Sequence, residues 1–215
     1  TAENIFNFIF GIFFFMSTYI TPEISKLNAE NNEKEIKNII SISLIVSSTI
    51  GIGVYFLTHL LSENYIYKYL GQTEITTTAH EYLKYRSISM PFTMINSTIF
   101  AILRSLLLFK KALRINLNSQ LINLILNLFF IKKFGINGIA IASIISDVFC
   151  SAQYFYFLID HKLVTFQLQN IIKKVKNIFK NGAFIQLRNL SLKIMNILLL
   201  RKILFLDNNG SDVAS

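Results

Sequence analysis

The stretch that decides the fold reads Ala112-Leu-Arg-Ile-Asn-Leu-Asn-Ser-Gln-Leu-Ile-Asn-Leu-Ile-Leu-Asn-Leu-Phe-Phe-Ile131, then Lys132-Lys-Phe-Gly-Ile-Asn-Gly138, then Ile139-Ala-Ile-Ala-Ser-Ile-Ile-Ser-Asp147 and an aromatic-rich continuation to Asp160. Each of its two apolar segments is long enough for a helix to cross about 30 Å of hydrocarbon. Because the connection between them is short, we expect the two helices to be antiparallel neighbours.

The two segments carry complementary faces. Amide and hydroxyl side chains recur every three or four residues along the first segment and so share one helical face. They are Asn116, Ser119, Gln120, Asn123 and Asn127. The second segment opens with small residues, which let helix backbones approach closely in lipid. They are Gly135, Gly138, Ala140, Ala142 and Ser143. A polar face opposite a small-residue face predicts a packed bundle around a polar centre.

The composition is that of a membrane protein. The chain has 215 residues, of which 53% are hydrophobic, with 20 Phe and no Trp. That apolar content is high for a soluble domain and ordinary for a protein with several membrane crossings. The net charge of +9 does not indicate nucleic-acid binding, because the Lys and Arg residues lie between apolar runs and form no basic face. Cys150 is the single cysteine and excludes an internal disulfide.

Four further apolar runs complete the predicted bundle. They cover residues 5–20, 39–61, 82–109 (which contains Pro91) and 183–205. Lys and Arg gather in alternate connections, at residues 26–37, 110–114 and 162–180, which predicts that these lie on one side of the membrane. Residues 163–179 read as an amphipathic interfacial helix. The predicted fold is therefore all-α, a polytopic membrane helix bundle with about six transmembrane helices.

The sequence carries no pattern typical of an enzyme. No His, Cys or carboxylate cluster has metal-ligand spacing, and no phosphate-binding loop or nucleophile elbow is present, so we expect neither a metal nor a cofactor. Polar residues within the crossings are the stronger signal, because an amide or charge in hydrocarbon normally faces a partner or a water-filled cavity. Asn123 and Asn127 could serve either as such a site or as hydrogen-bonding contacts between helices. Asp147 could form a structural ion pair with Arg188 or Lys193, and the alternative is a proton site.

Several motifs, in order along the chain, resemble the multidrug and toxic compound extrusion (MATE) transporters, and within them the DNA-damage-inducible protein F type. The motifs that carry the resemblance are Tyr82-Leu-Lys-Tyr-Arg86 with Pro91 and Leu103-Arg104, Asn123-Leu-Ile-Leu-Asn127, Phe134-Gly-Ile-Asn-Gly138-Ile-Ala-Ile-Ala-Ser143, Gly182 with Leu187-Arg188, and Asn4-Ile-Phe-Asn-Phe with Pro22. The resemblance covers nearly the whole chain. It is most specific over residues 82–146.

The resemblance implies a twelve-helix transporter of two lobes, of which this chain would supply helices two to seven. Residues 1–181 would form most of the first lobe, and residues 182–215 the first helix of the second. Such proteins export organic cations or amphiphilic compounds in exchange for protons or sodium ions. By position, the substrate- and ion-binding residues would be Asn123, Asn127, Ser143 and Asn96. Many members have an Asp where Asn127 stands, and because an amide cannot give up a proton near neutral pH, Asn127 could not itself carry one.

Two alternatives accompany the transporter hypothesis. One is a lipid-linked oligosaccharide flippase of the same superfamily, whose cavity should be more cationic because its cargo carries a pyrophosphate. The other is a truncated, inactive membrane protein, since residue 1 is Thr and the family's first helix is not found in the sequence. The expected partners are a small molecule, the lipid bilayer and either the remainder of the transporter or a second chain.

Overall fold

The computed structural model describes residues 15–61, 74–165 and 168–185, together with residues 187, 188, 191 and 195. Within these residues the chain forms helices and no strands, as the sequence predicts. The labelled helices are α2 (Phe15–Ala29), α3 (Glu33–Leu61), α5 (Glu74–Ser87), α6 (Met90–Ser105) and α7 (Phe109–Asp160). Residues 171–185 are also helical. The predicted runs 5–20 and 183–205 lie largely outside the described residues.

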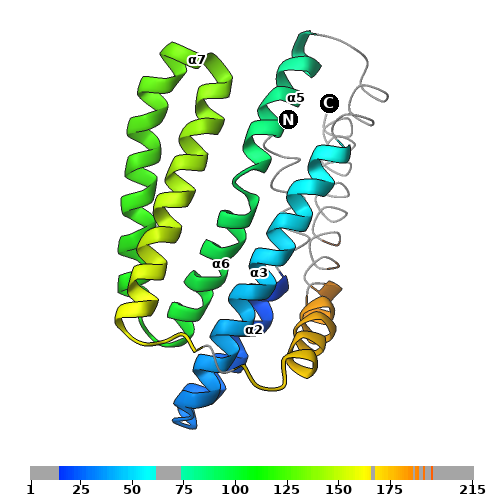
Figure 1. Ribbon diagram of the computed structural model, residues 1–215, viewed down its shortest axis with the longest axis vertical. Helices are drawn as coiled ribbons and strands as arrows, with labels where there is room; N and C mark the ends of the chain where they lie inside the picture. The colour runs from blue at the N-terminus through cyan, green and yellow to red at the C-terminus, as the bar shows by residue number, and fades with distance from the viewer. Residues whose placement is uncertain are drawn as a thin grey trace, which may run out of the picture.

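The helices run side by side as an elongated bundle, with α6 between α3 and the α7 hairpin (Figure 1). Helix α6 packs against α2, α3 and α7, which makes it the central element of the described bundle. Its buried side chains Ile99, Ile102 and Leu103 belong to one core cluster with residues of the three neighbouring helices. The core members from those neighbours include Ile20, Ile24, Ile40, Tyr154 and Leu158.

Helix α7 is a hairpin of two antiparallel arms, which confirms the predicted helix pair (Figure 1). The chain reverses at Gly135, whose φ of 58° and ψ of −139° lie in a region that is open to glycine and strained for other residues. Just beyond the turn, the two arms touch at Gly138. A Cβ atom there would lie 2.3 Å from the backbone oxygen of Phe130, so only glycine permits this approach. The small-residue face thus packs on the first arm as expected.

The crossing predicted at residues 82–109, which contains Pro91, is interrupted at residues 88–89 and so consists of parts of two helices. Helix α5 ends at Ser87 and α6 begins at Met90, so Pro91 falls in the first turn of α6. Proline is tolerated there, whereas in a continuous helix its ring would clash with the carbonyl group of Ser87, four residues earlier. Helix α3 packs closely at this point, since a Cβ on Gly51 would lie 2.5 Å from the Cα of Pro91.

Lysine and arginine residues lie beside or within the short connections at one end of the bundle. Residues 30–32, 106–108 and 161–165 all lie at the end opposite the Gly135 turn (Figure 1). This arrangement agrees with the predicted separation of charge between the two sides. The first of these connections is shorter than the predicted charged stretch 26–37, because α2 continues through Pro22 to Ala29 and α3 already begins at Glu33. Among the described residues, Glu33–His59 and Phe109–Asp160 are long and apolar enough to cross a membrane.

The segment that follows α7 is fixed to the start of α3. The side chain of Asn38 donates to the backbone oxygen of Gln169 at 3.2 Å and accepts from the backbone nitrogen of Gln169 at 3.1 Å. The backbone nitrogen of Thr165 donates to Ser41 Oγ at 2.9 Å. One face of helix 171–185 therefore lies on the bundle, with Ile178 buried in the core cluster.

Candidate functional site

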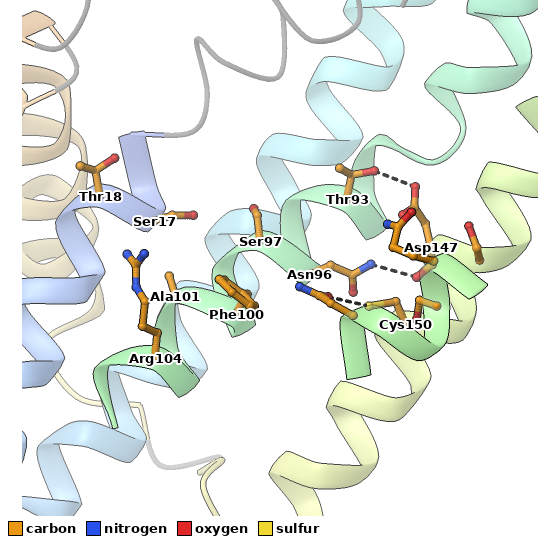
Figure 2. A pocket seen from close by; sticks show the side chains of 14 residues that line it. Ser17, Thr18, Thr93, Asn96, Ser97, Phe100, Ala101, Arg104, Asp147 and Cys150 are labelled. Carbon is orange, nitrogen blue, oxygen red and sulfur yellow. Dashed lines mark hydrogen bonds between the residues drawn. The ribbon is translucent and has the colours of Figure 1, made fainter. Parts of the chain in front are cut away.

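A cavity of about 500 Å³ opens between α2, α6 and the two arms of α7. Its wall combines hydroxyl, amide and apolar side chains (Figure 2). The lining residues are Ser17 and Thr18 of α2, Thr93, Asn96, Ser97, Phe100, Ala101 and Arg104 of α6, Asn116, Ser119 and Gln120 of the first arm, and Ser146, Asp147 and Cys150 of the second arm. A volume of this size falls within the usual range of small-molecule sites, about 300 to 1,000 Å³.

Helix α6 supplies one wall of the cavity as a single stripe. Thr93, Asn96, Ser97, Phe100 and Arg104 are spaced by one to four residues, so they share a helical face that turns toward α2 and α7 (Figure 2). The hydroxyl of Ser97 donates to the carbonyl group of its own preceding turn at 2.9 Å, which satisfies the hydroxyl without a contact to another helix. Other side chains of α6, among them Ile99, Ile102 and Leu103, are buried in the core cluster, so the helix that carries this wall is held firmly in the bundle.

Asn96 joins this wall to α7. Its side-chain nitrogen donates to the backbone oxygen of Asp147 at 3.0 Å, and its side-chain oxygen accepts from Ser151 Oγ at 2.8 Å. Asn96 is buried, so these two bonds offset the cost of desolvating its amide group. The residue both lines the cavity and holds two of its walls together.

Asp147 is the carboxylate of the described cavity wall, and its partner differs from the one predicted. Its Oδ2 lies 3.1 Å from Arg86 Nη1. The same oxygen accepts from Thr93 Oγ1 at 3.0 Å (Figure 2). Arg86 also donates to Ser89 Oγ. The partner is therefore not Arg188, one of the two predicted residues, and Lys193, the other, lies outside the described residues. The true partner comes from the end of α5, because the break before Pro91 brings Arg86 beside the second arm of α7.

Three of the four predicted site residues lie between the arms of α7 and are not among the lining residues of the cavity. Asn123 Nδ2 donates to Ser146 Oγ at 2.9 Å and to Ser143 Oγ at 3.4 Å, and Asn127 Nδ2 donates to Asn123 Oδ1 at 2.8 Å. These contacts favour the interhelical alternative for the two asparagines. Asn96 is the predicted residue that does line the cavity. A role of any of the four in binding stays a prediction.

The remaining cavity residues carried different amounts of sequence signal. Asn116, Ser119 and Gln120 belong to the polar helical face that the sequence predicts. The sequence did not indicate that this part of the face lines a cavity. The pairing of Arg86 with Asp147 joins residues 61 positions apart, which no local periodicity could indicate. Arg104 extends toward α2 and donates to Thr21 Oγ1 at 3.4 Å (Figure 2). Within the part of the chain that the structure describes, no three His, Cys, Asp or Glu residues could hold a metal ion together.

Comparison with known proteins gives a consistent result. The family model described as MatE matches residues 1–129. The fold is similar to an outward-facing multidrug resistance MATE transporter of the MOP superfamily, with a TM-score of 0.83 at 20% identity over 92% of this chain and 46% of that one. It is also similar to a MOP superfamily transporter from Pyrococcus furiosus, whose description reports a binding pocket of reverse polarity, with a TM-score of 0.79 at 20% identity over 92% and 45% of the two chains.

A third structure, a MATE protein in a bent conformation, gives a TM-score of 0.77 at 21% identity over 91% of this chain and 45% of that one. The chain thus spans about half the length of each of these structures. A comparison with curated proteins gave no significant match.

Proposed function

The chain belongs to the MatE family, and from this premise we propose that it forms one lobe of a multi-pass membrane transporter that moves amphiphilic small molecules through the cavity between α2, α6 and α7. In such a transporter the substrate binds near the middle of the bilayer, and the two lobes rock around it. Family members are transporters and not enzymes, so no chemical step is assigned to the site. The subfamily named in the sequence analysis stays a prediction.

The observation that carries this proposal is the polar cavity inside a membrane bundle. Polar groups in hydrocarbon are costly unless they face a partner or a cavity. Hydroxyl and amide groups from three helices converge here beside Phe100 and Ala101, so one wall can hold both the polar and the apolar part of an amphiphile. The outer face of α7, in contrast, exposes Leu121, Leu124 and Leu128, as a lipid-facing surface would.

Coupling to a proton or sodium gradient is part of the proposal. Asn127 lacks an ionisable group, so any coupling carboxylate of this lobe has to be another residue. Asp147 lies in the cavity wall and is the candidate among the described lining residues.

The flippase alternative lacks a supporting observation. A pyrophosphate-bearing cargo calls for several cations, and the described lining contains one, Arg104.

Transport can be tested by filling the cavity. In the full-length gene product, Ser97→Trp should place an indole ring in the space and reduce vesicle uptake of fluorescent amphiphiles by at least tenfold, because the ring occupies the substrate's volume. Uptake is measured under imposed proton and sodium gradients with ethidium and with anilinonaphthalene sulfonate. The matched control is Leu124→Trp on the lipid-facing surface, where the side chain is 57% exposed. Equal uptake by both variants at equal membrane levels would contradict the proposal.

A further inference from the structure

The described wall of the cavity contains two charged residues, Asp147 and Arg104. They stand far apart: Asp147 contacts Thr93, and Arg104 follows Thr93 by 11 positions (104 − 93) on the same helix. At the α-helical rise this separates the two ends of the stripe by about 16 Å. Asp147 and Arg104 therefore do not neutralise each other, and the charge that a substrate meets depends on the partners each of them already has.

Asp147 is already neutralised from behind the wall. Arg86, which is not among the lining residues, places Nη1 3.1 Å from Asp147 Oδ2. The pair is largely shielded, with 12% of the Arg86 side chain and 23% of the Asp147 side chain exposed. The attraction between two opposite charges is strong in such surroundings, and taking one partner away leaves an uncompensated charge. A cationic substrate would have to compete with a guanidinium that is covalently part of the same bundle.

Arg104 presents its charge to the cavity. Its one described hydrogen bond goes to the neutral hydroxyl of Thr21, at 3.4 Å, and its side chain is exposed. Figure 2 shows the guanidinium extending across the space toward Ser17 and Thr18 of α2. A guanidinium suits a carboxylate, sulfonate or phosphate oxygen pair, which it can bind with two parallel hydrogen bonds.

From this charge balance we propose that the cavity takes amphiphiles with an anionic head group, and that Arg86 determines this preference by neutralising Asp147. The head group binds at Arg104, and the apolar body lies along Phe100 and Ala101. The hydroxyl and amide groups around Thr93 and Asn96 bind neutral polar groups of the substrate. This inference rests on the proposed transport function and names the substrate class of the same cavity.

A charge cycle tests the inference. The purified full-length gene product in lipid nanodiscs is titrated with anilinonaphthalene sulfonate as the anionic probe and with ethidium as the cationic probe. The natural sequence should bind the sulfonate more tightly, and Arg104→Gln should weaken its binding by roughly tenfold because one charge-assisted contact is lost. Arg86→Gln exposes the Asp147 charge and should strengthen ethidium binding by roughly tenfold. The double variant Arg86→Gln/Asp147→Asn should return ethidium binding to its original level.

Two further variants protect the test against misfolding. Arg114→Gln removes the same charge at an exposed position outside the cavity and should change neither affinity. Asp147→Asn alone leaves Arg86 in place and should tighten sulfonate binding, a gain that a damaged protein would not show. The inference would be overturned if the natural sequence bound ethidium more tightly than the sulfonate and if Arg86→Gln left the ratio of the two affinities unchanged. That result would leave the transport function intact. Binding of neither probe, together with absent uptake, would instead overturn the transport function itself.

Discussion

At the scale of the residue, the polar side chains of the crossings fall into two groups that the sequence alone could not separate. Periodicity placed Asn116, Ser119, Asn123 and Asn127 on one helical face, and the structure agrees. The face is long, however, and only its first half reaches the cavity. Toward the turn, the same face meets the second arm and its amides are bonded there. A repeat of three and four residues reports direction around a helix but not distance from the centre of the bundle.

The inter-arm contacts predict a measurable contribution to stability. Asn123→Ala removes the bonds to Ser146, Ser143 and Asn127 and should lower the melting temperature of the full-length gene product, since such bonds in a membrane contribute about 0.6 kcal/mol on average and at most about 1.7 kcal/mol. Asn118→Ala is the control, because Asn118 makes a single exposed contact of 3.5 Å with Gln153. A melting temperature for Asn123→Ala that equals the control's would show that these bonds do not hold the arms together.

At the scale of the element, local chemistry predicted the hairpin but left open how Pro91 shapes the neighbouring crossing. The turn at Gly135 could be read from its glycine and its position between two apolar segments. Pro91 is compatible both with a kink inside a long helix and with the first turn of a new one. The structure has the second arrangement. At Gly51, helix α3 packs closely against the start of α6. Asp147 of α7 contacts Arg86 of α5 and Thr93 of α6, and so joins both helices to α7. Those contacts are non-local and lie beyond any sequence pattern.

The approach of the two α7 arms gives a prediction for a single methyl group. Gly138→Ala puts a Cβ 2.3 Å from the backbone oxygen of Phe130, so the arms must separate and the melting temperature should fall. Gly53→Ala on α3 is the matched control, because no atom lies within 4 Å of its added Cβ. This second change should leave stability equal or raise it by up to about 1 kcal/mol, as alanine is the better helix former. Equal melting temperatures for the two variants would mean that the hairpin is looser than described.

At the scale of the whole molecule, composition and the order of apolar runs were sufficient to predict a membrane helix bundle, and the family follows from residues 1–129. The common end of the basic connections was predictable too, because topology is written in the positions of Lys and Arg. The cavity was not. It is enclosed by α2, α6 and α7, and its charge depends on Arg86, which sits outside its wall. The cavity exists only once the helices are assembled, so no local sequence pattern indicates it. The lobe boundary predicted at residue 181 also concerns the assembled molecule, and it stays a prediction.

Transport through this lobe requires that the space beside α6 is a water-filled cavity within the membrane. The decisive measurement is thiol labelling of the full-length gene product in membrane vesicles, with its natural cysteines replaced and one cysteine introduced at a time. Ser97→Cys lies in the cavity wall, and Leu124→Cys lies on the lipid-facing side of α7. A water-soluble methanethiosulfonate reagent needs the ionised thiol, which forms in water and not in hydrocarbon. The predicted result is that the cysteine at position 97 is labelled, that a transported amphiphile slows this labelling, and that the cysteine at position 124 is not labelled. Equal labelling at the two positions, or no protection by the amphiphile, would contradict the presence of a water-filled substrate cavity.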